Sequence, residues 1–254
     1  MCSALLNVVD VSKRFGGVRA VDACTFDVGE LSVTGLIGPN GAGKSTVVDL
    51  ISGVVRADGG AITFEGTPVM GLPTYRIARL GVIRTFQIAR EFHRLTVMEN
   101  LLAVPLNQKG ETLWSALWRG RSVGEGERAN VDRASSLLAR FDLAELANEL
   151  AGNLSGGQKR LLELARALMY QPRLLILDEP LAGVNPSLAA TLAQHIRGLP
   201  SDGVSVLVIE HNLQMVEVMC DRIVVMNQGS VLAEGNMAEL RANPEVVSAY
   251  LGVA

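Results

Sequence analysis

The chain has 254 residues, of which 48% are hydrophobic and 19% charged, with a formal net charge of −3. This composition can supply a large buried core, and it excludes the basic surface of a nucleic-acid-binding protein, so we expect no nucleic-acid partner. Three scattered cysteines exclude a disulfide framework or zinc motif, and no apolar run reaches the roughly 18 residues of a membrane span. Because no basic start precedes an apolar export segment either, we expect a reducing, cytoplasmic setting.

The N-terminal region is predicted to form two short strands, residues 5–12 and 24–28, around a turn at Phe15-Gly16-Gly17. Phe15 lies 29 residues before Lys44. An aromatic ring here can stack on an adenine base, or it can be an ordinary core or hairpin residue. The spacing alone does not separate these alternatives.

A phosphate-binding loop follows the strand-like run 33–37. It fits the pattern G-x-x-x-x-G-K-[ST] and reads Gly38-Pro39-Asn40-Gly41-Ala42-Gly43-Lys44-Ser45-Thr46. The glycines let successive N–H groups turn toward one anion, Lys44 supplies a charge for the β- and γ-phosphates, and Ser45 offers a hydroxyl to Mg²⁺. The apolar run 47–51 predicts a helix whose N-terminus faces the phosphates. This strand–loop–helix context argues against an ordinary glycine-rich turn.

The middle of the chain is predicted to become helical. A strand at 61–64 and a helix from Pro73 to about residue 80 precede a buried strand at 82–86, which Gln87 ends. Gln87 can reach Mg²⁺ or an attacking water from that edge, or it can be a surface residue. Residues 92–98 are either core or an apolar patch for a partner. A short amphipathic helix at 112–118 and a longer one at 127–141 suggest a helical subdomain over 85–153.

A second polar stretch, Leu154-Ser155-Gly156-Gly157-Gln158, begins a helix predicted to run to Tyr170. Ser155 is a favourable N-cap residue. The exposed N–H groups of such a helix start can bind an anion, although plain capping explains the residues equally simply. Physical reasoning by itself favours capping.

Carboxylates follow the next aliphatic strand, 174–179, which ends in Asp178 and Glu179. Ligands bind at the carboxyl ends of parallel strands, so Asp178 is placed to hold Mg²⁺ and Glu179 to orient or deprotonate water. After a helix at 186–197, the strand 204–209 brings His211 to the same edge. A hairpin at 223–233 and two short helices, 237–241 and 244–251, complete the prediction.

Taken together, these motifs resemble the ATP-binding subunit of ATP-binding cassette (ABC) transporters over nearly the whole chain. The resemblance implies an α/β P-loop NTPase core with a parallel sheet, an N-terminal antiparallel β subdomain and a helical subdomain. The corresponding ranges are 1–84 and 154–236 for the core, 85–153 for the helical subdomain and insert, and 237–254 for a helical tail. It also identifies Ser155, Gly156, Gly157 and Gln158 as the family's signature, which overrules the capping interpretation.

The resemblance assigns further roles residue by residue. Gln87 matches the Mg²⁺-sensing glutamine, Asp178 the magnesium aspartate and Glu179 the catalytic glutamate. His211 matches the γ-phosphate histidine and Phe15 the adenine-stacking aromatic. Asn185 stands where the family often carries an aspartate.

The subgroup is indicated by four features: Arg84-Thr85-Phe86-Gln87, the long insert after Leu102, the stretch 182–186, and the tail at 243–252. They look like branched-chain amino acid importers, although lipopolysaccharide-export ATPases share part of the pattern. A soluble ABC ATPase acting on DNA or ribosomes would carry a heptad insertion, tandem cassettes or a basic surface. A non-hydrolysing module would lack Glu179 or Ser155.

The implied cofactors are ATP and Mg²⁺. The implied partners are transmembrane permeases, a second ABC ATPase subunit in a head-to-tail dimer (the same or a sister chain) and, indirectly, a substrate-binding protein. The implied location is the cytoplasmic face of the inner membrane.

Overall fold

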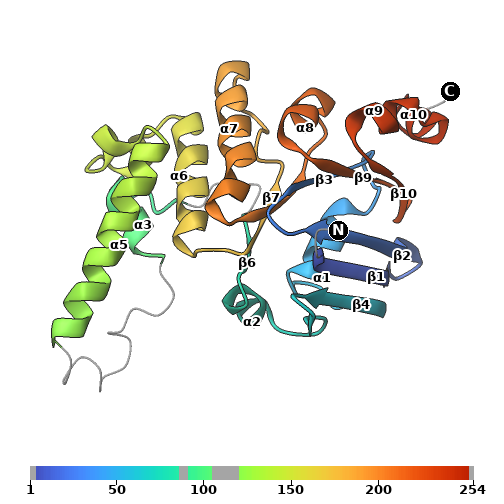
Figure 1. Cartoon of the computed structure of the whole chain (residues 1–254), viewed down its shortest axis with the longest axis horizontal. Helices are drawn as coiled ribbons and strands as arrows, with labels where there is room; N and C mark the ends of the chain where they lie inside the picture. The colour runs from blue at the N-terminus through green and yellow to red at the C-terminus, as the bar shows by residue number, and fades with distance from the viewer. Residues whose placement is uncertain (1–3, 86–90, 105–119, 252–254) are drawn as a thin grey trace. The chain divides into compact units, whose positions relative to one another are not determined.

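The computed structural model describes residues 4–85, 91–104 and 120–251 (Figure 1). The chain packs as two units. The sheet unit comprises Met1–Gln87 and Arg173–Ala254, and the helical unit comprises Ile88–Pro172. Across the described ranges, no helix is long and apolar enough to cross a membrane.

The sheet unit contains two sheets. The four-stranded antiparallel sheet has the order β2-β1-β4-β5, and the six-stranded sheet has the order β10-β9-β3-β8-β7-β6. The strands are β1 (Ala4–Phe15), β2 (Val18–Gly29), β3 (Val33–Ile37), β4 (Gly59–Phe64), β5 (Thr67–Pro68), β6 (Val82–Arg84), β7 (Leu174–Asp178), β8 (Ser205–Ile209), β9 (Arg222–Asn227) and β10 (Ser230–Gly235).

The central strands β3, β7 and β8 are buried along their whole length, as their aliphatic sequences predict. They run parallel, with Leu36 and Asp178 both paired with Ile209. Their carboxyl ends therefore meet at one edge of the sheet, which is where ligands bind in open parallel sheets.

Helices cover both faces of the six-stranded sheet within this unit. They are α1 (Lys44–Ile51), α2 (Thr74–Arg79), α7 (Pro186–Gly198), α8 (Leu213–Met219), α9 (Met237–Ala242) and α10 (Pro244–Leu251), with a 3₁₀ turn at Leu199–Asp202. Helices α7 and α8 lie on one face, while α1 lies on the other, between the two sheets (Figure 1). One apolar core joins both sheets to α1 through Leu36, Val47, Ile62, Ile176 and Leu207.

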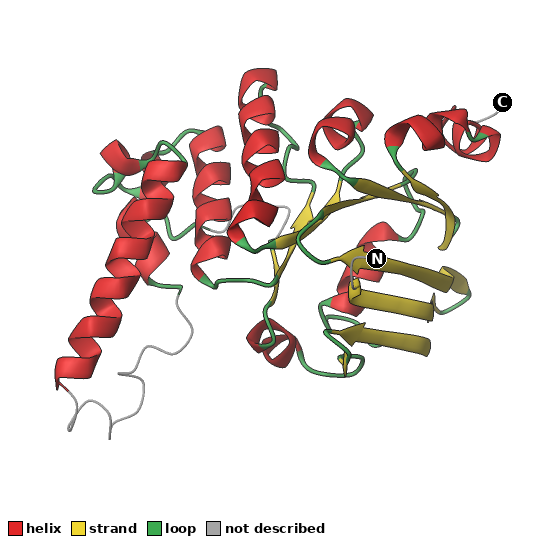
Figure 2. Cartoon of the chain, in the orientation of Figure 1, coloured by secondary structure: helices red, strands yellow, loops and turns green. Residues whose placement is uncertain are grey.

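The described part of the helical unit consists of helices and loops (Figure 2). Its helices are α3 (Val97–Leu102), α5 (Gly120–Arg140) and α6 (Gly156–Met169), with 3₁₀ turns at Ala144–Leu146 and Ala151–Asn153. Buried Asn100 accepts from Phe92 N at 2.9 Å and donates to the carbonyls of Phe92, Leu95 and Thr96. One side chain therefore organises the loop that leads into α3.

Several boundaries differ from the sequence-based expectation. Strands β1 and β2 extend to within three residues of each other, because their cross-strand pairing continues to Phe15 and Val18. Helix α5 begins at Gly120 rather than 127, and β6 ends at Arg84 rather than 86. The expected helix at 112–118 lies outside the described residues. Helix α6 belongs to the helical unit, so that unit ends at Pro172, whereas the expected subdomain ended at residue 153.

Candidate nucleotide-binding site

The loop between β3 and α1 has the backbone that its glycines allow. Gly38, Gly41 and Gly43 have φ values of 154°, 81° and 97°. A Cβ on Gly38 would meet the Met226 carbonyl oxygen at 2.2 Å. No side chain among the described residues caps the start of α1, so its first N–H groups are free to bind an anion.

Lys44, the first residue of α1, is half-buried and folds back over the loop. Its Nζ donates to the carbonyl oxygens of Gly38 at 2.7 Å and Pro39 at 3.0 Å. Burial lowers the pKa of the Lys44 ammonium, and the nearby charges of Glu179 and Asp178 partly oppose that shift. The sheet unit thus brings Lys44 close enough to Asp178 and Glu179 for their charges to interact.

Asp178 ends β7 and is only 4% exposed. Its Oδ2 accepts from Arg84 Nη2 at 2.9 Å, whereas its buried Oδ1 has no hydrogen-bond partner in the described part of the chain. Glu179 follows in a left-handed conformation with φ of 48° and is partly exposed. A buried, unpaired carboxylate oxygen is costly unless a ligand satisfies it.

These residues fit a magnesium ion. The described residues contain no group of three or more His, Cys, Asp or Glu side chains that could hold a metal. Mg²⁺ does not need such a cage, because it keeps several waters and binds one or two protein ligands together with substrate phosphates. Asp178 and the exposed Ser45 in the first turn of α1 match that requirement.

His211 follows β8 at the same sheet edge, and its side chain is 65% exposed. The preceding Glu210 is buried, and its oxygens accept from Leu181 N at 3.0 Å and His211 N at 3.2 Å. Burial raises the pKa of Glu210. Glu210 thus ties the segment after Glu179 to the segment that carries His211. This residue was not predicted from the sequence, although a carboxylate directly after an aliphatic strand was a usable signal.

Phe15 ends β1 at the hairpin and is 48% exposed, with Lys13 Nζ 5.4 Å from its ring centroid. The ring is therefore not a core residue, which leaves the hairpin and base-stacking interpretations. Gln87, the predicted metal-sensing residue, lies outside the described residues.

The signature stretch begins α6 in the helical unit. Ser155 Oγ accepts from Gln158 N at 3.3 Å, and Gln158 Oε1 accepts from Ser155 N at 2.9 Å, which together form a capping box. Among the described residues, a Cβ on Gly156 would meet no atom within 4 Å. Capping therefore accounts for Ser155 and Gln158, while packing against the described part of the chain does not account for Gly156.

Asn185 caps α7, because its Oδ1 accepts from Leu188 N at 2.9 Å. An aspartate would serve the same purpose. The departure from the family pattern at this position therefore preserves the local structure.

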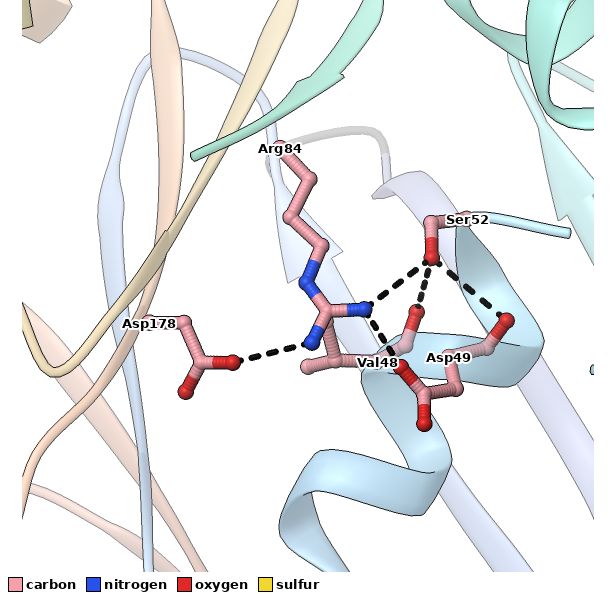
Figure 3. Close-up of polar contacts among 5 residues, drawn as sticks. All are labelled: Val48, Asp49, Ser52, Arg84 and Asp178. Atoms are coloured by element: carbon pink, nitrogen blue, oxygen red, sulfur yellow. Dashed lines mark hydrogen bonds and ion pairs between the residues drawn. The ribbon is translucent and has the colours of Figure 1, made fainter. Parts of the chain in front are cut away.

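Arg84 completes the site and was not assigned a role from the sequence. Its guanidinium lies between Asp178 and Asp49 and also approaches Ser52 (Figure 3). The available signal was a single charged residue in the otherwise apolar strand 82–84.

The chain matches known proteins over its full length. Residues 21–182 match the family model described as ABC transporter, and residues 230–254 match the one described as branched-chain amino acid ATP-binding cassette transporter. The chain is 42% identical to the high-affinity branched-chain amino acid transport ATP-binding protein BraF of Pseudomonas aeruginosa, with 100% of both chains covered. It is 43% identical to the probable branched-chain amino acid transport ATP-binding protein LivG of Archaeoglobus fulgidus, covering 98% of this chain and 95% of the relative.

Solved structures agree with this similarity. A nucleotide-free ATP-binding cassette from an ABC transporter superposes with a TM-score of 0.84 at 35% identity, covering 99% of this chain and 100% of the other. The ADP conformation of the cassette MJ1267 gives a TM-score of 0.83, also at 35% identity and with the same coverage.

Proposed function

The chain belongs to the ABC transporter family of ATP-hydrolysing subunits, and on that premise we propose that it powers an importer for branched-chain or related amino acids. The observation that carries the proposal is the full-length similarity to relatives named for branched-chain amino acid transport. The second family match, over residues 230–254, supports the same subgroup at the C-terminal tail.

The sheet unit binds and hydrolyses ATP in this proposal. The N–H groups of the loop 38–43 and the Lys44 ammonium hold the phosphates, with Phe15 against the adenine. Ser45, Asp178 and Gln87 hold Mg²⁺, which when bound supplies positive charge to the phosphates. Glu179 accepts a proton from the water whose oxygen attacks the γ-phosphorus, while the bond to the β–γ bridging oxygen breaks and ADP leaves. His211 contacts the γ-phosphate.

Two ATP-binding subunits act together, either two copies of this chain or this chain and a sister chain. In a head-to-tail dimer, Ser155 and the backbone N–H groups of Gly156 and Gly157 approach the γ-phosphate held by the partner. The open space at Gly156 supports this role, because it leaves the start of α6 accessible. ATP then favours the closed dimer by binding it more tightly than the open one.

The dimer works on transmembrane permeases at the cytoplasmic face of the inner membrane, and a substrate-binding protein supplies the amino acid. The Gln87 region and the patch around Phe92 to Met98 are the proposed link to the permeases. Phe92 supports this role, since it is 50% exposed with Arg166 stacked 4.9 Å from its ring centroid. Val97 is fully buried and instead belongs to the core of the helical unit.

The ATPase proposal is tested with Glu179→Gln. We expect the variant to bind a fluorescent ATP analogue like the wild type, while phosphate release falls about 10²- to 10⁴-fold, because the general base is lost. Glu145→Gln, which changes an exposed carboxylate of the helical unit, is the matched control and keeps full activity. Unchanged hydrolysis in Glu179→Gln would remove Glu179 from the mechanism.

The transport proposal is tested in cells that carry Glu179→Gln in place of the wild-type chain. We expect uptake of radiolabelled leucine, isoleucine and valine to fall, and two permeases with a second cassette to co-purify from solubilised membranes. Normal uptake of all three amino acids, or recovery of ribosomal or DNA-repair proteins in place of permeases, would refute the importer assignment and leave the ATPase assignment intact.

A further inference from the structure

Arg84 lies at the centre of a partly buried ion-pair cluster in the sheet unit. Its side chain is 14% exposed, and its two terminal nitrogens contact different carboxylates. Nη1 donates to Asp49 Oδ1 at 2.5 Å, and Nη2 donates to Asp178 Oδ2 at 2.9 Å (Figure 3). A planar guanidinium suits such a bridge, because its donors have a fixed fork geometry.

The backbone fixes which groups this bridge joins. Arg84 ends β6 and pairs in register with Ile176 of β7, so Asp178 lies two residues further along the neighbouring strand, on the same face as Ile176. Asp49 lies on α1 four residues after Ser45, which is about one helical turn. Arg84 therefore connects the strand that ends in Asp178 to the helix that begins beside Ser45.

The two carboxylate oxygens of Asp178 have different environments, because only one of them contacts Arg84. Oδ2 is occupied by Arg84, while the buried Oδ1 has no hydrogen-bond partner in the described residues and remains available to a cation. Burial works to lower the pKa of Arg84, but the hydrogen bonds that Arg84 donates to Asp49 and Asp178, together with their negative charges, outweigh burial and raise that pKa. The guanidinium therefore stays charged while it orients Asp178.

Ser52 strengthens the contact with α1. Its Oγ donates to Val48 O at 2.7 Å and lies 3.5 Å from Arg84 Nη1. Arg84 thus contacts the end of α1 at Asp49 and also at the C-cap residue Ser52, which limits how the helix can shift relative to β7.

We propose that Arg84 is a positioning residue that pre-organises the magnesium site by holding Asp178 and the Ser45 helix in a fixed relation. The inference rests on the proposed Mg²⁺–ATP function, and it adds Arg84 and Asp49 as residues that orient the magnesium site without contacting the metal. Groups that orient metal ligands act through ligand geometry, so their loss weakens metal affinity more than it weakens binding of the rest of the substrate.

The test compares nucleotide binding with and without metal, using a fluorescent ATP analogue and a Mg²⁺ titration. For Arg84→Met, we expect the Mg²⁺ concentration at half-maximal effect to rise about 10- to 100-fold, the range for loss of an orienting partner. Nucleotide affinity in EDTA stays within about twofold of wild type, because the loop and Lys44 are untouched. Arg84→Lys recovers part of the loss, since an ammonium lacks the two-pronged geometry.

Arg173→Met is the matched control. Arg173 lies just before β7, is 50% exposed and pairs with Glu30 and Glu65, away from the metal site. It should leave the Mg²⁺ dependence unchanged. Asp49→Asn tests the helix end of the bridge independently, and we expect a smaller loss of Mg²⁺ affinity in the same direction.

The outcomes separate the two proposals. If wild-type binding itself does not depend on Mg²⁺, the proposed metal site fails. If the wild type depends on Mg²⁺ and folded Arg84→Met has the same dependence, the positioning role is overturned. If Arg84→Met does not fold, wild-type Mg²⁺ dependence in both Arg84→Lys and Asp49→Asn overturns it.

Discussion

Replacing Gly43 by alanine tests whether the phosphate loop is held by the close backbone contact seen here. Gly43 has φ of 97°, and an added Cβ would lie 2.4 Å from the Ala20 carbonyl oxygen, whereas ordinary contacts begin at 3.4 Å. The left-handed conformation costs a non-glycine residue roughly 1–2 kcal/mol. Moving the loop away from β2 by about 1 Å adds an overpacking cost of roughly 1–3 kcal/mol. The total destabilisation is therefore about 2–5 kcal/mol.

Gly41→Ala provides the matched control for this prediction. Gly41 also has a positive φ, of 81°, but none of the described residues places an atom within 4 Å of its added Cβ. Only the conformational cost applies, so Gly43→Ala should melt roughly 2–12 °C below Gly41→Ala, at about 2–4 °C per kcal/mol.

The assay is scanning calorimetry without nucleotide, followed by ATP hydrolysis on the folded variants. A loop displaced by about 1 Å should lower hydrolysis by roughly 10²-fold in Gly43→Ala. Equal melting temperatures for the two variants would refute the claim that contact with Ala20 constrains the loop.

Three further predictions address the signature, the helical core and the thiols. Ser155→Ala and Thr96→Ala each remove one capping-box side chain, so each should lower the free energy of unfolding by about 0.5–2 kcal/mol. Only Ser155→Ala should also lose ATP hydrolysis. Equal hydrolysis in both variants would show that Ser155 acts only as a helix cap. Phe141→Ala should lower the free energy of unfolding by about 3–5 kcal/mol in urea titrations, since the ring is fully buried; a loss below about 1 kcal/mol would contradict its place in the core. Burial raises the pKa of Cys24 and of Cys220 to about 12. In the variant Cys2→Ser, neither remaining thiol should therefore react quickly with Ellman's reagent at about pH 8 before unfolding, and fast reaction of either would contradict its raised pKa.

The chemistry of the phosphate loop was predictable because it depends on a short local sequence pattern. A turn that curls nine residues around an anion needs glycine, lysine and serine at fixed spacing, whatever the rest of the chain does. The capping box at Ser155 and Gln158 is local in the same sense. The aliphatic runs before Asp178 and Glu210 likewise indicated buried parallel strands, and the similarity to ABC cassettes confirmed that fold.

Element ends were less predictable because pairing partners determine them. Strands β1 and β2 continue almost to their turn, since each residue that pairs gains its ladder hydrogen bonds from the other strand. The added residues, 13–15 and 18–23, mix charged side chains with apolar ones such as Phe15, Val18 and Val21, so the sequence alone gave no regular apolar pattern to extend.

The sequence by itself determined the class of chemistry: a phosphate loop, a carboxylate pair after a buried strand, and a capped helix carrying the signature. Only the tertiary structure decided that Arg84 joins Asp49, 35 residues away, to Asp178, 94 residues away. The physical reason is strand order. Strands β6 and β7 are adjacent in the sheet, although the helical unit, with its described helices α3, α5 and α6, separates them in the chain. Residues without a common local pattern therefore become neighbours.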